Sequence, residues 1–115
     1  MPEGLLGDAK ALQIIRGKES PNKIKKRYSF LIRLAKSDID TATAIDVISA
    51  IYNIDSIECK KQITAWYKTS NLPKFPASKV VRLYIQSLAN EELRDLKKWK
   101  KIGGGVVPGS PEWEK

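Results

Sequence analysis

The feature that most constrains the fold of this chain is a series of segments in which apolar residues recur with the period of a helix, several of them preceded by a residue that can cap a helix. Ser20 precedes Pro21, which is typical of a helix start: serine can accept a bond from a free amide, and proline lacks the amide hydrogen that would be left unpaired there. From about Pro21 to Lys36 apolar residues recur at helical steps, at Ile24, Tyr28, Leu31 and Ala35. This range is predicted as an amphipathic helix with one buried side.

Two further helices are predicted on either side of Asn53. Asp38 or Asp40 can cap a helix over Thr41 to Tyr52, and Asn53 suits a left-handed stop.

Asp55 and Glu58 have the spacing of a capping box, which predicts a helix from about Ser56 to Thr69. Its inward side chains would be Cys59, Ile63 and Trp66.

The second half of the chain resumes the pattern after a connector, residues 71–76, in which two prolines exclude a helix. One helix is predicted to begin at Ser78, and another to be capped by Asn90. Their buried stripe would contain Val81, Tyr84, Ile85, Leu88, Leu93, Leu96 and Trp99. A short extra helix is expected between Asp8 and Arg16. We therefore expect an all-α fold, a compact bundle of five to six short helices.

The domain organisation follows from composition. Residues 1–19 are expected to form an N-terminal arm with a short helix, and residues 20–102 the helical domain. Residues 103–115 are expected to form a flexible tail, because they begin with three glycines and contain little apolar material.

The absence of histidine and the single cysteine argue against an enzyme. Histidine is the usual general base and the commonest metal ligand, and Cys59 alone can form neither an intramolecular disulfide nor a thiolate zinc site. The carboxylate pairs Asp38/Asp40 and Glu91/Glu92 are each accounted for by a helix start. We expect no catalytic residue, metal or cofactor.

Location and membrane association follow from hydropathy. No apolar run approaches the roughly 20 residues that span a bilayer, and the first residues lack the basic and apolar regions of a signal peptide. The chain is expected to be cytoplasmic and not to associate with a membrane.

Charge is the strongest indication of a partner. The chain carries 21 Lys and Arg against 13 Asp and Glu, a net charge of +8. Residues 21–36 hold six bases and no acid, residues 38–55 hold four acids and no base, and residues 56–101 hold eleven bases and four acids. Such segregation can fold into one basic face, which favours an acidic polymer as partner.

The stretch Lys61 to Lys68, KQITAWYK, is followed by Leu72-Pro73-Lys74-Phe75. Together these resemble the recognition-helix region of lambda-repressor-like helix-turn-helix proteins, most closely the cII-type phage transcription activators. The resemblance covers residues 45–88. It implies a helix-turn-helix-like unit in which Ile63 and Trp66 anchor the second helix while the neighbouring residues face the major groove.

The sequence departs from that family between Asn53 and Ile63. This interval is about four residues longer than in the family, whose helix-turn-helix joins its helices by a short turn, and it contains no glycine. The lengthened interval is also similar to a small bacterial domain family of unknown function that shares the Trp-containing helix and the proline connector.

The residues expected to bind nucleic acid fall into two groups. Lysines suit phosphate, glutamine can pair with adenine, and the threonine methyl can contact thymine. The helix over 56–69 supplies Lys60, Lys61, Gln62, Thr64 and Lys68, and the helix over 21–36 supplies Lys25, Lys26 and Arg33. The alternative is that these are ordinary solvated helix faces.

Three aromatic residues and the cysteine have their own alternatives. Trp66 is expected in the core and Trp99 as a partly buried packing residue, with base stacking as the alternative for Trp99. Trp113 lies in the tail and is either a short peptide anchor or without a role. Cys59 is expected to be a small buried hydrophobe rather than a redox sensor.

The function expected from these features is a small basic DNA-binding regulator or accessory factor of phage or bacterial type. Dimerisation would be expected of a single weak reader, because two half-sites multiply its affinity, but the sequence identifies no seam for a homodimer. The alternatives are a protein-interaction module, an inhibitor or assembly factor that docks its basic helical face on an acidic protein, and RNA binding.

Overall fold

The computed structural model describes residues 3–102, and every regular element in that range is an α-helix, as the sequence predicts. The helices are α1 (Glu3–Ala11), α2 (Pro21–Lys36), α3 (Thr41–Tyr52), α4 (Ser56–Lys68) and α5 (Ala77–Ile102). Trp113 and the predicted tail lie outside the described residues. None of the helices within residues 3–102 combines the length and the apolar content that crossing a membrane requires.

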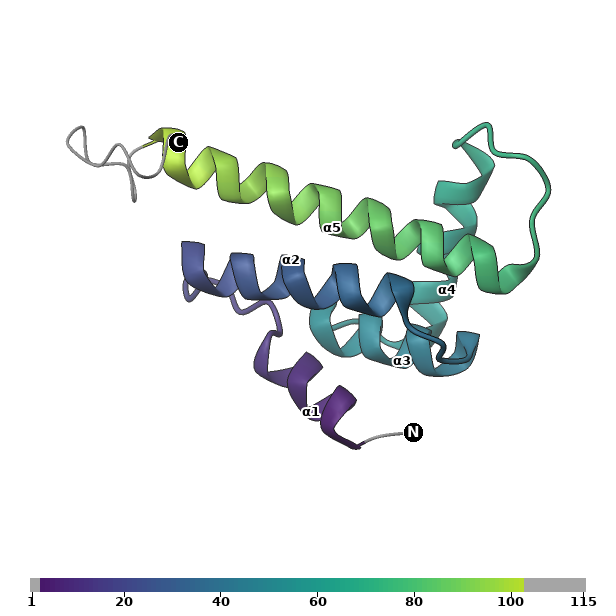
Figure 1. Cartoon of the computed structure of the whole chain (residues 1–115), viewed down its shortest axis with the longest axis horizontal. Helices are drawn as coiled ribbons and strands as arrows, with labels where there is room; N and C mark the ends of the chain where they lie inside the picture. Colours follow the sequence, from purple (N-terminus) through teal and green to yellow (C-terminus); the bar gives the residue numbers. More distant parts are fainter. Residues whose placement is uncertain (1–2, 103–115) are drawn as a thin grey trace.

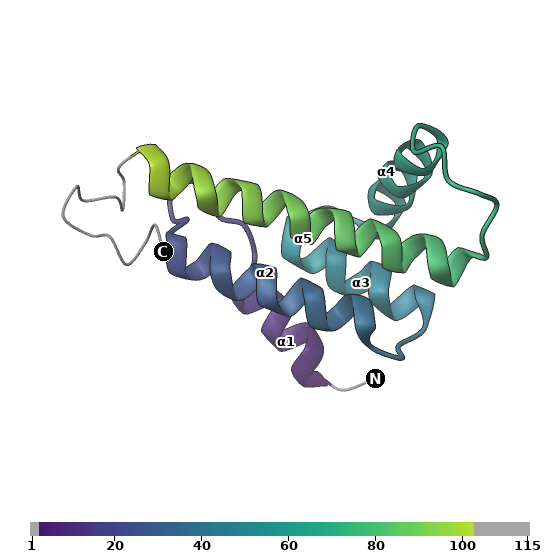
Figure 2. The same ribbon diagram turned by 45° about the horizontal axis from the view of Figure 1, so that its top comes forward.

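The bundle is organised around the pair α2 and α5, which run side by side in opposite directions (Figures 1 and 2). Helix α3 packs against α5, and α1 packs against α3. Helix α4 packs against α3 and α5, and lies near the end of the pair where α2 finishes and α5 begins (Figure 1).

Helix α5 is one helix where the sequence predicted two. Asn90 is exposed in its interior and caps nothing. No glycine or proline occurs between Ala77 and Ile102, and the buried stripe runs on without a break through Ala89 and Glu92. Continuous packing therefore outweighs the modest helix preference of a single asparagine.

The helix ends follow the predicted caps. The Ser20 side chain accepts a bond from the Lys23 amide at 3.2 Å, and Asp55 accepts one from the Glu58 amide at 2.7 Å. Asn53 is left-handed, with φ of 56°. Asp40 occupies the N-cap of α3, where its carboxylate accepts a bond from the Thr43 hydroxyl and no helix amide. The turn between α3 and α4 is three residues long, so the residues that lengthen the interval to Ile63 lie within α4.

The first helix is displaced from its predicted range, Asp8 to Arg16. Helix α1 ends at Ala11, and Ile14 and Ile15 are exposed. Ala9 is fully buried, and the Gln13 side chain donates a hydrogen bond to the Ala50 carbonyl at 2.9 Å. The N-terminal segment is thereby held on α3.

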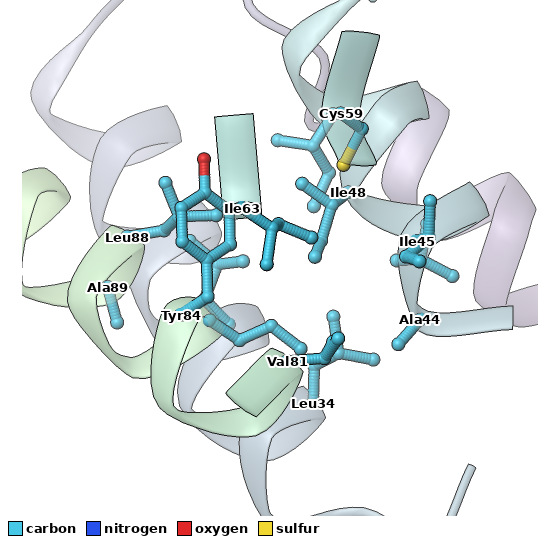
Figure 3. Packing of buried hydrophobic residues seen from close by; sticks show 14 of the residues in the cluster. Leu34, Ala44, Ile45, Ile48, Cys59, Ile63, Val81, Tyr84, Leu88 and Ala89 are labelled. Carbon is cyan, nitrogen blue, oxygen red and sulfur yellow. The ribbon is translucent and has the colours of Figure 1, made fainter. Parts of the chain in front are cut away.

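One hydrophobic core joins all five helices, with Ala9 as the buried member from α1. Figure 3 shows core residues from the other four helices. Helix α2 is rotated from its predicted phase: Phe30 and Leu34 are buried, whereas Tyr28 and Ala35 are half-buried. From α4 the buried residues are Cys59 and Ile63, as predicted. Trp66 differs from the prediction, because it is only half-buried.

A buried arginine connects the helices through polar contacts. Arg27, counted above among the bases of 21–36, is 1% exposed. Its Nη1 donates to Glu92 at 2.8 Å, its Nη2 to Glu19 at 2.6 Å and its Nε to the Leu12 carbonyl at 2.9 Å. The Tyr52 hydroxyl donates to the second oxygen of Glu92 at 2.9 Å. Glu92 was predicted at a helix start and is instead 4% exposed inside the bundle.

Within this cluster the positive charge of Arg27 lies against the carboxylates of Glu19 and Glu92. Burial raises the pKa of Glu19, but the hydrogen bond and charge of Arg27 outweigh it and hold that pKa below its usual value. Burial likewise lowers the pKa of Arg27, and its bonds to Glu92 and Glu19 raise it further than burial lowers it. Glu19 and Arg27 therefore stay ionised, and removal of Arg27 leaves the buried Glu92 without its cation.

Arg27→Ala is expected to destabilise the protein by about 3 to 5 kcal/mol, because it leaves Glu92 buried without a cation. Arg33→Ala removes the same side chain from the exposed side of α2 and is expected to cost less than about 0.5 kcal/mol. Urea unfolding followed by circular dichroism measures both. Equal, small losses would show that the buried ion pair does not hold the helices together.

The Cys59 thiol is expected to resist modification in the folded protein. It is 1% exposed, and burial raises its pKa, so little thiolate exists at neutral pH. An aromatic disulfide reagent should label it slowly in buffer and rapidly in denaturant. Equal rates in the two solutions would mean that Cys59 is accessible in the native state and that the buried assignment is wrong.

Candidate nucleic-acid interface

The five residues expected on the reading helix all lie exposed on α4. Cys59 and Ile63 dock the inner side of α4, so the opposite side faces solvent with Lys60, Lys61, Gln62, Thr64 and Lys68. The lysines form no salt bridge with the described residues. Their charges are free to meet an anionic partner.

The C-terminal half of α4 is held by aromatic contacts. The Trp66 and Tyr84 rings meet edge to face, with centroids 5.4 Å apart. The Tyr67 hydroxyl donates to the Pro73 carbonyl at 2.7 Å and accepts a bond from the Phe75 amide at 3.0 Å. The Tyr67 bonds hold the connector against the end of α4, and the Trp66 contact holds α4 against α5.

That arrangement adds cations which the sequence analysis did not single out. Lys74 is exposed on the connector, and Lys79 and Arg82 are exposed at the start of α5. Lys79 Nζ lies 4.2 Å from the centre of the Phe75 ring. Arg82 makes an exposed ion pair with Asp38 at 3.7 Å, a contact that contributes little.

These residues form the largest acid-free part of the described chain. Between Glu58 and Glu91 there are six bases and no acid. All six are exposed, on α4, the connector and the first turns of α5, at the end of the molecule that carries α4 (Figure 2). We call this set the α4-end cations: Lys60, Lys61, Lys68, Lys74, Lys79 and Arg82. The uninterrupted run is the signal that sequence reasoning missed.

The two expected base readers have local partners. Thr64 donates its hydroxyl to the Lys60 carbonyl at 2.9 Å, within α4. Gln62 donates its amide to the Glu58 carboxylate at 3.3 Å. To bind a base edge, the Gln62 amide would have to give up its bond to Glu58, and the Thr64 hydroxyl its bond to Lys60. The Thr64 methyl can contact thymine without the loss of either bond.

The second predicted group lies elsewhere. Lys25, Lys26 and Arg33 are exposed and line a groove of about 530 Å³ between α1 and α2, together with Asp8 and Asn22. Helix α4 packs on α3 and α5, not beside this groove. The two groups of bases therefore form separate surfaces, and Arg27, between Lys26 and Tyr28 in sequence, belongs to neither.

Metal binding has no candidate in residues 3–102, where no three metal-ligating side chains gather. Comparison of the chain with models of protein families, with curated protein sequences and with solved structures gives no match.

Proposed function

We propose that this protein binds double-stranded DNA through the α4-end cations, as a small regulator or accessory factor. The observation that carries the proposal is the segment from Cys59 to Asn90, in which every charged side chain is basic and exposed. Bases that neutralise phosphates release condensed counterions from DNA, which is the main source of affinity for a duplex.

The shape of the α3–α4 connection supports the same proposal. Two helices joined by a three-residue turn are the architecture that the resemblance to helix-turn-helix activators implies. Asn53 takes the left-handed conformation for which glycine is the usual choice. In this proposal α4 enters the major groove, with its lysines on phosphates and Gln62 and Thr64 nearest the base edges.

A protein partner is the second candidate, and one residue favours it. Ile57 lies on the first turn of α4 and is 65% exposed. A large exposed aliphatic side chain beside lysines suits an acidic protein surface with an apolar centre. A partner of that kind would depend on Ile57, whereas a duplex would not.

Replacing Lys60, Lys61 and Lys68 by alanine is expected to weaken binding to any duplex while leaving the fold intact, because all three point away from the core. If each lysine contacts one phosphate, the slope of log affinity against log salt should fall by about 0.9 per lysine. Fluorescence anisotropy with a labelled duplex, from about 50 mM salt upward, measures both effects.

The matched control removes the same charge from the other end of α5, by changing Arg94, Lys97 and Lys98 to alanine. All three are exposed. This control should change the slope much less. Absence of salt-dependent duplex binding by the wild-type protein, or equal losses in the two variants, would contradict the proposed surface. Stronger binding to a competing RNA would redirect the proposal to RNA, and binding lost in Ile57→Ala but not in the lysine variant would favour a protein partner.

The groove bases give a separate prediction. Replacement of Lys25, Lys26 and Arg33 by alanine should lower affinity for all sequences alike if the DNA also reaches α2, since these residues would meet phosphates only. Gln62→Ala should instead reduce discrimination between sequences by about 1 to 3 kcal/mol. Competition with duplexes of different sequence separates these effects. Loss of discrimination in the α2 variant would contradict the assignment of base reading to α4.

A further inference from the structure

A cavity at the junction of α3, α4 and α5 is not accounted for by DNA binding. Its volume is about 410 Å³, within the range of small-molecule sites. Ile48, Ile54 and Leu88 line it with aliphatic carbon. Such walls suit the hydrocarbon part of a ligand.

Tyr84 supplies a polar group without a protein partner. It lines the cavity and is only 8% exposed, yet its hydroxyl makes no hydrogen bond with any residue in the described part of the chain. Figure 3 shows this hydroxyl directed away from Val81 and Leu34 at the core. Burial raises the pKa of Tyr84 to about 12, so the hydroxyl stays neutral at physiological pH and can both donate and accept.

The second tyrosine of the cavity shows the contrast. Tyr52 also lines it, but its hydroxyl is committed to Glu92 at 2.9 Å. The Tyr84 hydroxyl has no such commitment, and no buried side-chain oxygen or nitrogen of the described residues lacks a hydrogen bond, so this hydroxyl reaches solvent at the cavity. Tyr84 therefore supplies the hydroxyl that a ligand can engage.

The other polar groups of the cavity are also oxygens. Gln62 uses its amide nitrogen on Glu58, which leaves its carbonyl oxygen as an acceptor. Glu91 lies exposed on the lining and brings a carboxylate. Among the residues that the structure describes, no lysine or arginine lines this cavity, although the chain as a whole is strongly basic.

We propose that this cavity binds a small primary amine with an apolar body. An ammonium group carries three donors and no acceptor, which matches the oxygens of Tyr84, Gln62 and Glu91. The carboxylate of Glu91 attracts a cation and repels an anion. A neutral alcohol has no positive charge and gains nothing from that carboxylate beyond a hydrogen bond. The hydrocarbon part lies against Ile48, Ile54 and Leu88.

The test compares three probes that share one aromatic body: phenethylamine, phenethyl alcohol and phenylpropionate. Each is titrated into the full-length protein, and binding is followed by amide chemical shifts. Phenethylamine is expected to bind saturably and to shift amides around the cavity. The alcohol should bind about tenfold more weakly, since hydrogen bonds to charged groups add on the order of 1.4 kcal/mol or more. Phenylpropionate should not bind.

Two variants identify the groups involved. Tyr84→Phe removes only the hydroxyl and keeps the ring that contacts Trp66, and Glu91→Gln removes only the charge. Each is expected to weaken phenethylamine by about fivefold or more, as loss of one such bond predicts. Tyr28→Phe, on a ring outside the cavity, is the control and should change nothing.

Three results would overturn the proposal. They are no saturable binding of phenethylamine in the millimolar range, equal binding of the amine and the alcohol, and unchanged affinity in Tyr84→Phe. Thermal unfolding of each variant shows whether it is folded. If Tyr84→Phe does not fold, the result with Glu91→Gln decides, because Glu91 is exposed and not part of the core.

Discussion

The arrangement of the helices depends on one buried guanidinium. Arg27 reaches from α2 to Glu92 on α5, to Glu19 and to the Leu12 carbonyl, and Glu92 in turn binds Tyr52 of α3. Hydrophobic contacts alone tolerate small rotations and shifts of a helix, whereas a planar guanidinium with three fixed acceptors does not. The cluster therefore defines the register of α2 against α5. The other elements pack around that pair.

The sequence predicts the local features of this fold well. The helix ends at Ser20, Asn53 and Asp55 lie where the side chain or the backbone preference of that residue favours a helix end. These preferences depend only on neighbouring residues in the sequence, so they can be predicted locally. Asn90 shows the limit of the same argument. Asparagine is common both at caps and within exposed helix faces, and only the packing of α5 against α2 decides between them.

Long-range contacts explain what could not be predicted. The burial of Arg27 was not predicted, because its partner Glu92 is 65 residues away in sequence. The exposure of Lys60, Lys61 and Lys68 was predictable from helical period. The addition of Lys74 and Lys79 to them was not, because it depends on how the Tyr67 hydroxyl holds the connector. A basic helix can be recognised from its pattern, but a basic surface requires the positions of several elements.

Helix α4 buries fewer side chains than the long helices do. It is therefore expected to separate from the bundle before α2 and α5 separate from each other. Only Cys59 and Ile63 of α4 are buried, whereas the long helices carry extended buried stripes and the Arg27 cluster. Amide hydrogens in α4 and the connector should accordingly exchange with solvent through a partial opening that leaves α2 and α5 paired. The surface proposed to meet a partner thus belongs to the part of the molecule that can adjust its position without unfolding the rest.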